Sequence, residues 1–124
     1  MEAKTKNVIL WVVSALLAVG FVFAGAAKVV VDPAAAAENF EALGFPGGMA
    51  MFIGICEIAG GIGLLVPRLA GLAASGLVII MIGAVYVHVA NTPLAEAIPA
   101  LVMGLLCVFV VYSRGLPFGS KAAA

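Results

Sequence analysis

Three ionisable side chains, Lys28, Glu57 and His88, lie within or at the edge of apolar stretches of the sequence. An ionisable group in hydrocarbon costs several kcal/mol unless it is partnered, so each is a candidate for ligand binding or proton transfer. Glu57 is the strongest candidate, because it is near the middle of its stretch. The structural alternative is a protonated or paired carboxyl group that only holds helices together. We favour the role in binding or proton transfer.

Glu57 shares a helical face with small residues at steps of three or four, namely Ala50, Gly54 and Gly61. Small residues let another helix approach closely, so we expect this face to point into a helix bundle. At about 1.5 Å per residue, Glu57 lies roughly 7 Å deeper than Lys28 from the same boundary, a gap that their side chains can close. An ion pair between them and a lysine that reaches out to the lipid headgroups are equally supported.

His88 closes a later apolar stretch on the same side as Lys28. A single histidine at such a boundary is usually a hydrogen-bonded polar residue without further function. Ionisable groups that converge from different helices on one half of a bundle are instead typical of ligand sites and proton relays. We therefore predict that Lys28, Glu57 and His88 bind a ligand, and we assign no catalytic residue.

Cys56 and Cys107 also fall inside apolar stretches, not at the spacings of a disulfide framework or a zinc site. Both are expected about 10 to 14 Å below the same boundary, so a redox pair between two helices is one interpretation. A free cysteine is commonly a small apolar core residue, and we favour this second interpretation. The sequence shows no cluster of metal ligands, and we expect neither a metal nor an intrinsic cofactor.

The composition is that of a membrane protein. Of the 124 residues, 65% are hydrophobic and 10% are charged, whereas soluble domains are roughly half apolar and a quarter charged. A chain of this length forms one domain, and its apolar surface must be covered largely by the lipid bilayer. The formal net charge is zero, which gives no sign of a nucleic-acid partner.

Four apolar stretches approach or reach the roughly 17 to 25 residues that an α-helix needs to cross a bilayer. They cover about residues 8–31, 49–66, 69–90 and 98–112. A helix satisfies its own backbone hydrogen bonds in lipid, and these stretches lack the alternation of a barrel strand. We predict an all-α fold, an integral membrane four-helix bundle with residues 1–124 in a single transmembrane domain.

The basic residues predict the orientation. Most of them lie on the side that holds both termini and the turn between the second and third stretches: Lys4, Lys6, Arg68, Arg114 and Lys121. The positive-inside rule therefore places both termini in the cytoplasm and the protein in the inner or plasma membrane. A secretory signal cleaved near Ala24-Gly25-Ala26 is the alternative. We disfavour it because the apolar run is long for such a signal.

A short interfacial helix is predicted over residues 33–43, between the first two stretches. Asp32 can cap this helix, Pro33 suits its first turn, and Gly44 can end it. Its apolar residues share one face and its polar residues the other, the pattern of a helix that lies at a membrane surface. Such a helix would cover the outer end of the bundle.

Several motifs in order resemble the DoxX family of small four-span membrane proteins. They are Phe23-Ala24-Gly25-Ala26-Ala27-Lys28, Gly54-Ile55-Cys56-Glu57-Ile58-Ala59-Gly60-Gly61, Pro67-Arg68-Leu69-Ala70 and finally His88. The resemblance implies a four-helix membrane bundle. It also implies a link to quinone-dependent or thiol-dependent redox enzymes, or to membrane assembly factors, without a catalytic role for any single residue.

We therefore expect a redox-associated membrane subunit that binds a lipophilic molecule such as a quinone, with electrons supplied by a larger membrane or redox enzyme complex. The alternative is a non-enzymatic accessory or assembly subunit, in which Lys28, Glu57 and His88 are structural. A transporter is a third interpretation, which 124 residues would achieve only as an oligomer. The sequence assigns no enzymatic activity of its own.

Overall fold

The computed structural model describes residues 3–91 and 94–115, and these ranges contain helices and no strand. The predicted all-α fold class is confirmed. Lys121, which contributes to the predicted orientation, lies outside the described residues. The elements in chain order are α1 (Ala3–Ala26), η1 (Ala27–Val31), α2 (Pro33–Ala42), α3 (Gly48–Gly63), α4 (Pro67–Asn91), η2 (Leu94–Ala97) and α5 (Ile98–Arg114).

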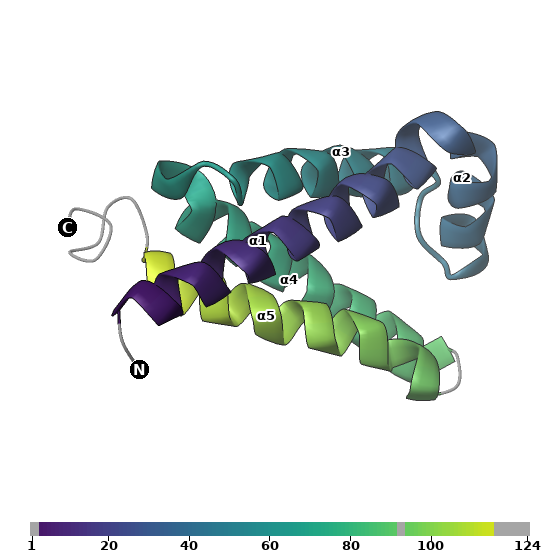
Figure 1. Ribbon diagram of the computed structural model, residues 1–124. Coiled ribbons are helices and arrows are strands. Elements are labelled where there is room, and N and C mark those ends of the chain that lie inside the picture. Colours follow the sequence, from purple (N-terminus) through teal and green to yellow (C-terminus); the bar gives the residue numbers. More distant parts are fainter. Residues whose placement is uncertain (1–2, 92–93, 116–124) are drawn as a thin grey trace.

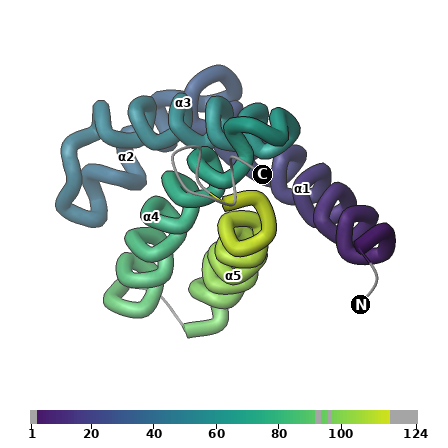
Figure 2. The backbone as a smooth tube through the Cα atoms, turned by 90° about the vertical axis from the view of Figure 1, so that its left-hand side faces the viewer, coloured from purple at the N-terminus to yellow at the C-terminus, as the bar shows by residue number. Residues whose placement is uncertain are grey.

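The four long helices form two pairs (Figures 1 and 2). α1 packs along α3 and α4 packs along α5, and these are the most extensive contacts between elements. The turn between α3 and α4 is tight, because the backbone N–H groups of Leu64, Leu65 and Val66 all donate hydrogen bonds to carbonyl groups of α3. From this turn the α1–α3 pair and the α4–α5 pair diverge. As a result, α2 lies apart from the last turn of α4 and the first turn of α5 (Figure 1).

Small residues bring α1 and α3 into close contact. A Cβ atom added to Gly54 would lie 2.9 Å from the Lys28 Cβ and 3.0 Å from the Gly25 carbonyl oxygen. A side chain at this position would therefore push the two helices apart. The predicted inward face of this helix is confirmed, because its members are all buried: Ala50, Gly54, Glu57 and Gly61.

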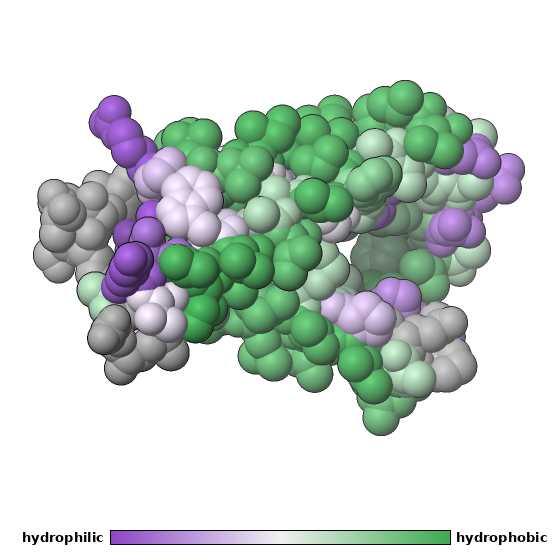
Figure 3. Space-filling model, viewed as in Figure 1, coloured by the Kyte–Doolittle hydropathy of each residue, from purple (hydrophilic) through white to green (hydrophobic). Residues whose placement is uncertain are grey.

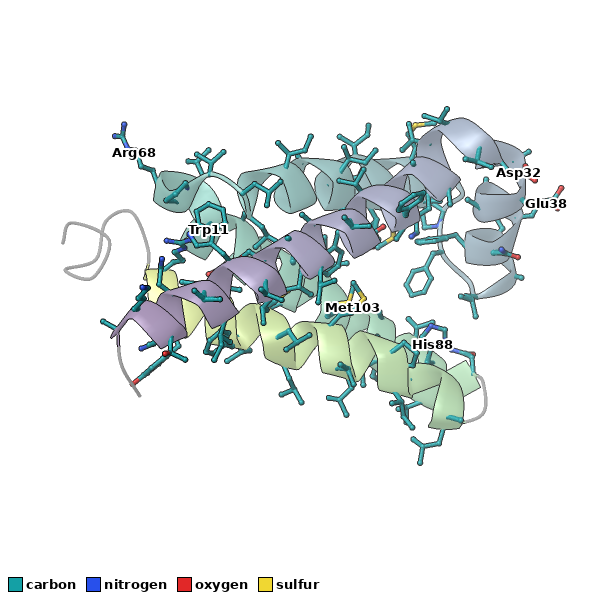
Figure 4. All side chains as sticks on the ribbon, viewed as in Figure 1. Trp11, Asp32, Glu38, Arg68, His88 and Met103 are labelled. Carbon is teal, nitrogen blue, oxygen red and sulfur yellow. The ribbon has the colours of Figure 1, made fainter. Side chains whose placement is uncertain are left out.

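Exposed apolar side chains cover the long sides of the molecule (Figure 3). Phe23, Ile79 and Leu105 are examples, with 73%, 70% and 61% of their surfaces exposed. Polar residues gather at the two ends, with Arg68 at one end and Asp32 at the other (Figure 4). An apolar belt between polar ends is the surface that a lipid bilayer covers.

Two helical stretches are long and apolar enough to cross a bilayer, judged by length and composition. They are α1 together with η1, which has 29 residues, and α4, which has 25. α3 and α5 are apolar but have only 16 and 17 residues, or about 24 to 26 Å at the helical rise. Helices thus form at all four predicted stretches. That the four helices cross the bilayer stays a prediction.

The predicted surface helix forms as α2. The Asp32 Oδ1 atom accepts a hydrogen bond from the Ala35 backbone N–H at 3.1 Å, which satisfies one of the free donors of the first turn. Pro33 occupies that turn, as expected. Gly44 follows the helix with a φ of 89°, a left-handed conformation that glycine adopts at little cost.

Candidate ligand-binding site between the helix pairs

Lys28 and Glu57 form an ion pair where the first helical stretch meets α3. The Lys28 ammonium group donates a hydrogen bond from Nζ to Glu57 Oε1 over 2.7 Å. The same Nζ atom donates a second hydrogen bond to the Ala24 carbonyl oxygen at 3.3 Å. Of the two interpretations of Lys28, the ion pair is therefore confirmed, and the ammonium group is turned into the bundle instead of toward the lipid headgroups.

A π-helical segment carries Lys28. Residues Ala27–Val31 form η1, in which the turns are one residue wider than in an α-helix. The Asp32 backbone N–H closes this segment with a hydrogen bond to the Ala27 carbonyl oxygen at 3.3 Å. Wide turns of this kind are rare and occur frequently at functional sites. The sequence did not predict the segment, because a run of alanine and valine around Lys28 does not distinguish a π-helix from an α-helix.

The two partners of the ion pair differ in exposure. The Glu57 side chain is 5% exposed, whereas the Lys28 side chain is 24% exposed. A buried carboxylate requires a partner, and Lys28 supplies it. Because part of the Lys28 side chain stays open, a ligand with an acceptor oxygen can reach this pair without separation of α1 from α3.

The surface of the molecule is hollowed between α2 and the place where α4 ends and α5 begins (Figure 3). His88 lies near the end of α4, on the opposite side of this hollow from α2 (Figure 4). Its side chain is half-buried. The structure thus brings Lys28 and Glu57 into direct contact, and it places His88 on the other helix pair, facing the same end of the molecule.

The two cysteines occupy different environments, and both thiols are free. Cys56 is half-buried and lines an apolar groove between α3 and α4, together with Gly60 and Leu77. Cys107 is fully buried in the core of α5. Both therefore pack as small apolar residues, in line with the interpretation favoured from the sequence.

The polar groups at this site suit hydrogen bonding to a ligand. Within the ranges that the structure describes, no group of three or more His, Cys, Asp or Glu side chains could hold a metal ion. The site instead offers an ammonium group and a carboxylate, and an imidazole lies across the hollow. Such groups can donate and accept hydrogen bonds, and they can exchange protons with a ligand that carries oxygen atoms.

Sequence reasoning missed a second polar cluster at the opposite end of the bundle, where α1 begins and α5 ends. The Arg114 guanidinium carbon lies 4.9 Å from the centre of the Trp11 ring, and Lys6 Nζ lies 5.6 Å from the centre of the Tyr112 ring. The available signal was that a basic and an aromatic residue stand at the start of the first apolar stretch and again at the end of the fourth. The basic residues among them predicted only the orientation of the chain.

The comparisons with known proteins give a family. Residues 12–110 match the model of the DoxX-like family. This range includes Lys28, Glu57 and His88. No curated protein and no solved structure matches the chain.

Proposed function

Because the chain belongs to the DoxX-like family, whose members are small membrane proteins, we propose that it is a redox-associated membrane subunit. In this proposal it binds a lipophilic molecule such as a quinone at the α2 end of the bundle. One observation carries the proposal, the 2.7 Å ion pair between Lys28 and Glu57 inside an apolar bundle. A paired charge at such a position is costly to maintain and is most often functional.

The chemistry of a quinone fits this arrangement. The Lys28 ammonium group can donate a hydrogen bond to a quinone carbonyl oxygen and pass a proton to it as the ring is reduced, and the Glu57 carboxylate can accept a proton from the quinol hydroxyl when the ring is oxidised again. His88 can form a hydrogen bond with the second quinone oxygen from the other side of the hollow. A quinone takes up electrons as well as protons, and in this proposal the electrons come from a partner redox protein in the membrane.

The orientation in the membrane belongs to the same proposal. Arg68 lies at the end of the bundle where α1 begins and α5 ends, and Asp32 and Glu38 lie at the other end (Figure 4). The positive-inside rule then places the basic end in the cytoplasm and the Lys28–Glu57 pair toward the outer leaflet of the inner or plasma membrane.

The test compares two substitutions that remove one carboxylate each. Glu57→Gln keeps the shape of the side chain and a hydrogen-bond acceptor for Lys28, but it removes the negative charge and the ability to accept a proton. Glu41→Gln, at an exposed position in α2, is the matched control. Binding of decylubiquinone to the purified protein should weaken about tenfold in Glu57→Gln, or about 1.4 kcal/mol, and should stay unchanged in the control. Unchanged binding in Glu57→Gln would refute the proposal.

A second candidate is the accessory or assembly subunit, and α4 carries the observation that favours it. Gly76 and Gly83 are exposed, and a Cβ atom added to either would meet no atom within 4 Å. Small residues on an open helix face allow the helix of another membrane protein to pack closely. A stable complex with a larger enzyme that survives Glu57→Gln but is lost in Gly83→Leu would support this candidate over the quinone-binding subunit.

A further inference from the structure

The end of the bundle opposite α2 concentrates positive charge. Lys4, Lys6 and Arg114 belong to the start of α1 and the end of α5, and Arg68 lies at the start of α4 at the same end (Figure 4). We call this region the basic end. The acidic side chains that the structure describes all lie elsewhere: Asp32, Glu38, Glu41 and Glu57. The basic end therefore has a positive field that no described carboxylate neutralises.

Arg114 has a defined position at the basic end. Its guanidinium group lies over the ring of Trp11, with 4.9 Å between the guanidinium carbon and the ring centre. This contact joins α5 to α1. A guanidinium group held over an aromatic ring by a cation–π contact still has N–H groups that can donate to an acceptor beside the ring.

Several donors in this cluster lack an acceptor. The Arg114 Nε and Nη2 atoms and the Ser113 hydroxyl are covered by protein and have no hydrogen-bond partner among the described residues. Covered N–H groups of a cation are costly to leave unpaired. Arg114 as a whole is only half-buried, so part of its side chain is open to the membrane interface beside the covered donors. An acceptor from outside the described residues would satisfy these donors.

We propose that the basic end binds the headgroup phosphate of an anionic phospholipid. A phosphate group offers several acceptor oxygens, which match the fork of an arginine, and the serine hydroxyl can donate to another. Lys6, which lies over the Tyr112 ring at 5.6 Å, adds a second cation at the same end. Tryptophan and tyrosine are typical of the depth at which lipid headgroups lie. The site does not depend on the proposed function at the α2 end.

Trp11 provides the probe, because it is the single tryptophan of the chain. Dibrominated phospholipids quench the fluorescence of a tryptophan that they contact. Dibrominated phosphatidylglycerol and dibrominated phosphatidylcholine are titrated separately into the purified protein in detergent. We expect the anionic lipid to quench Trp11 at a concentration about tenfold lower than the zwitterionic lipid. Equal quenching by the two lipids would overturn the proposal.

Substitutions locate the site. Arg114→Gln should remove the preference for phosphatidylglycerol, a loss of about tenfold, whereas Arg68→Gln should change it less than about twofold. Arg68 is the matched control because it is an exposed cation at the same end with no aromatic partner among the described residues. An equal loss in both variants would mean general attraction to positive charge, and no loss in Arg114→Gln would also refute the site.

Two further measurements are needed. The first uses a variant that is expected to fold normally, and the second distinguishes a lipid headgroup from free phosphate. Ser113→Ala leaves the contact of Arg114 with Trp11 in place, and it should weaken the binding of phosphatidylglycerol roughly fivefold because Ser113 donates to the phosphate. An unchanged affinity would contradict the site as proposed. Inorganic phosphate at millimolar concentration should not displace the lipid. If it does, the basic end is a site for free anions and the lipid proposal is wrong.

Discussion

The contact of α1 with α3 at Gly25 allows a quantitative prediction. A Cβ atom added to Gly25 would lie 2.6 Å from Ile58 Cγ1 and 3.1 Å from the Ile58 backbone nitrogen, and it would also clash with the Gly54 carbonyl oxygen. Two of these three atoms belong to the α3 backbone, which cannot move aside without the whole helix. Gly25→Ala should therefore separate α1 from α3.

The magnitude follows from these distances. Carbon atoms in ordinary contact are about 3.5 to 4.0 Å apart, so the helices must separate by on the order of 1 Å. Overpacking of this kind costs about 1 to 3 kcal/mol, and we expect the upper end because backbone atoms are involved. The control is Gly83→Ala, since a Cβ atom at Gly83 would meet no atom within 4 Å. Alanine is favoured over glycine inside a helix by up to about 1 kcal/mol, but this gain applies to both variants and cancels in the comparison, so they should differ by the overpacking cost of roughly 2 to 3 kcal/mol.

The assay is reversible unfolding in mixed micelles, with increasing sodium dodecyl sulfate and helix content followed by circular dichroism. Gly25→Ala should unfold at a clearly lower mole fraction of the denaturing detergent than the parent protein, and Gly83→Ala at the same or a higher one. If both variants unfold together with the parent, α1 and α3 do not pack through Gly25 and Gly54 as described, and the positioning of Lys28 beside Glu57 loses its basis.

Two other predictions concern the groups that this packing positions. Lys28→Met leaves Glu57 without its partner and should lower the free energy of unfolding by about 3 kcal/mol. The double variant Lys28→Met with Glu57→Leu should recover most of that loss. Strictly additive effects of the two substitutions in the same detergent assay would show that the pair is not coupled. The two thiols should not pair with each other, so labelling by N-ethylmaleimide should be the same with and without reductant, and the buried Cys107 should react only after unfolding. An increase in labelling on reduction would instead reveal a Cys56–Cys107 pair.

Much of the fold could be predicted from the sequence, because hydrocarbon constrains a chain strongly. A stretch of apolar residues in lipid has to be helical, and the four predicted stretches coincide with α1 and η1, α3, α4 and α5. The boundaries were harder to predict. α1 already begins at Ala3, ahead of the apolar stretch that starts at Val8, because polar residues such as Lys4 and Lys6 can continue a helix into the headgroup region, where hydrophobicity no longer marks its end.

The candidate site could be predicted only in part. The small-residue face of α3 indicated that Glu57 points inward, and the depth of Lys28 allowed the ion pair that the structure contains. The sequence did not indicate that His88 would be on a different helix pair, because depth along the bilayer normal says nothing about lateral position. The stack of Arg114 on Trp11 depends on how α1 crosses α5, and no residue pattern within either helix encodes that crossing.

The π-helical segment at Ala27–Val31 also affects how relatives of this chain should be compared. A π-helical turn contains one more residue than the α-helical turn it replaces, so a relative can lack one residue here and continue as a regular helix. Such a deletion after Lys28 leaves the register of α1 unchanged, with Gly25 still opposite Gly54. Sequence alignments of the family should therefore permit a single-residue gap between Lys28 and Asp32. An alignment without this gap will match Lys28 correctly, but it will pair residues of α2 with the wrong residues of the relative.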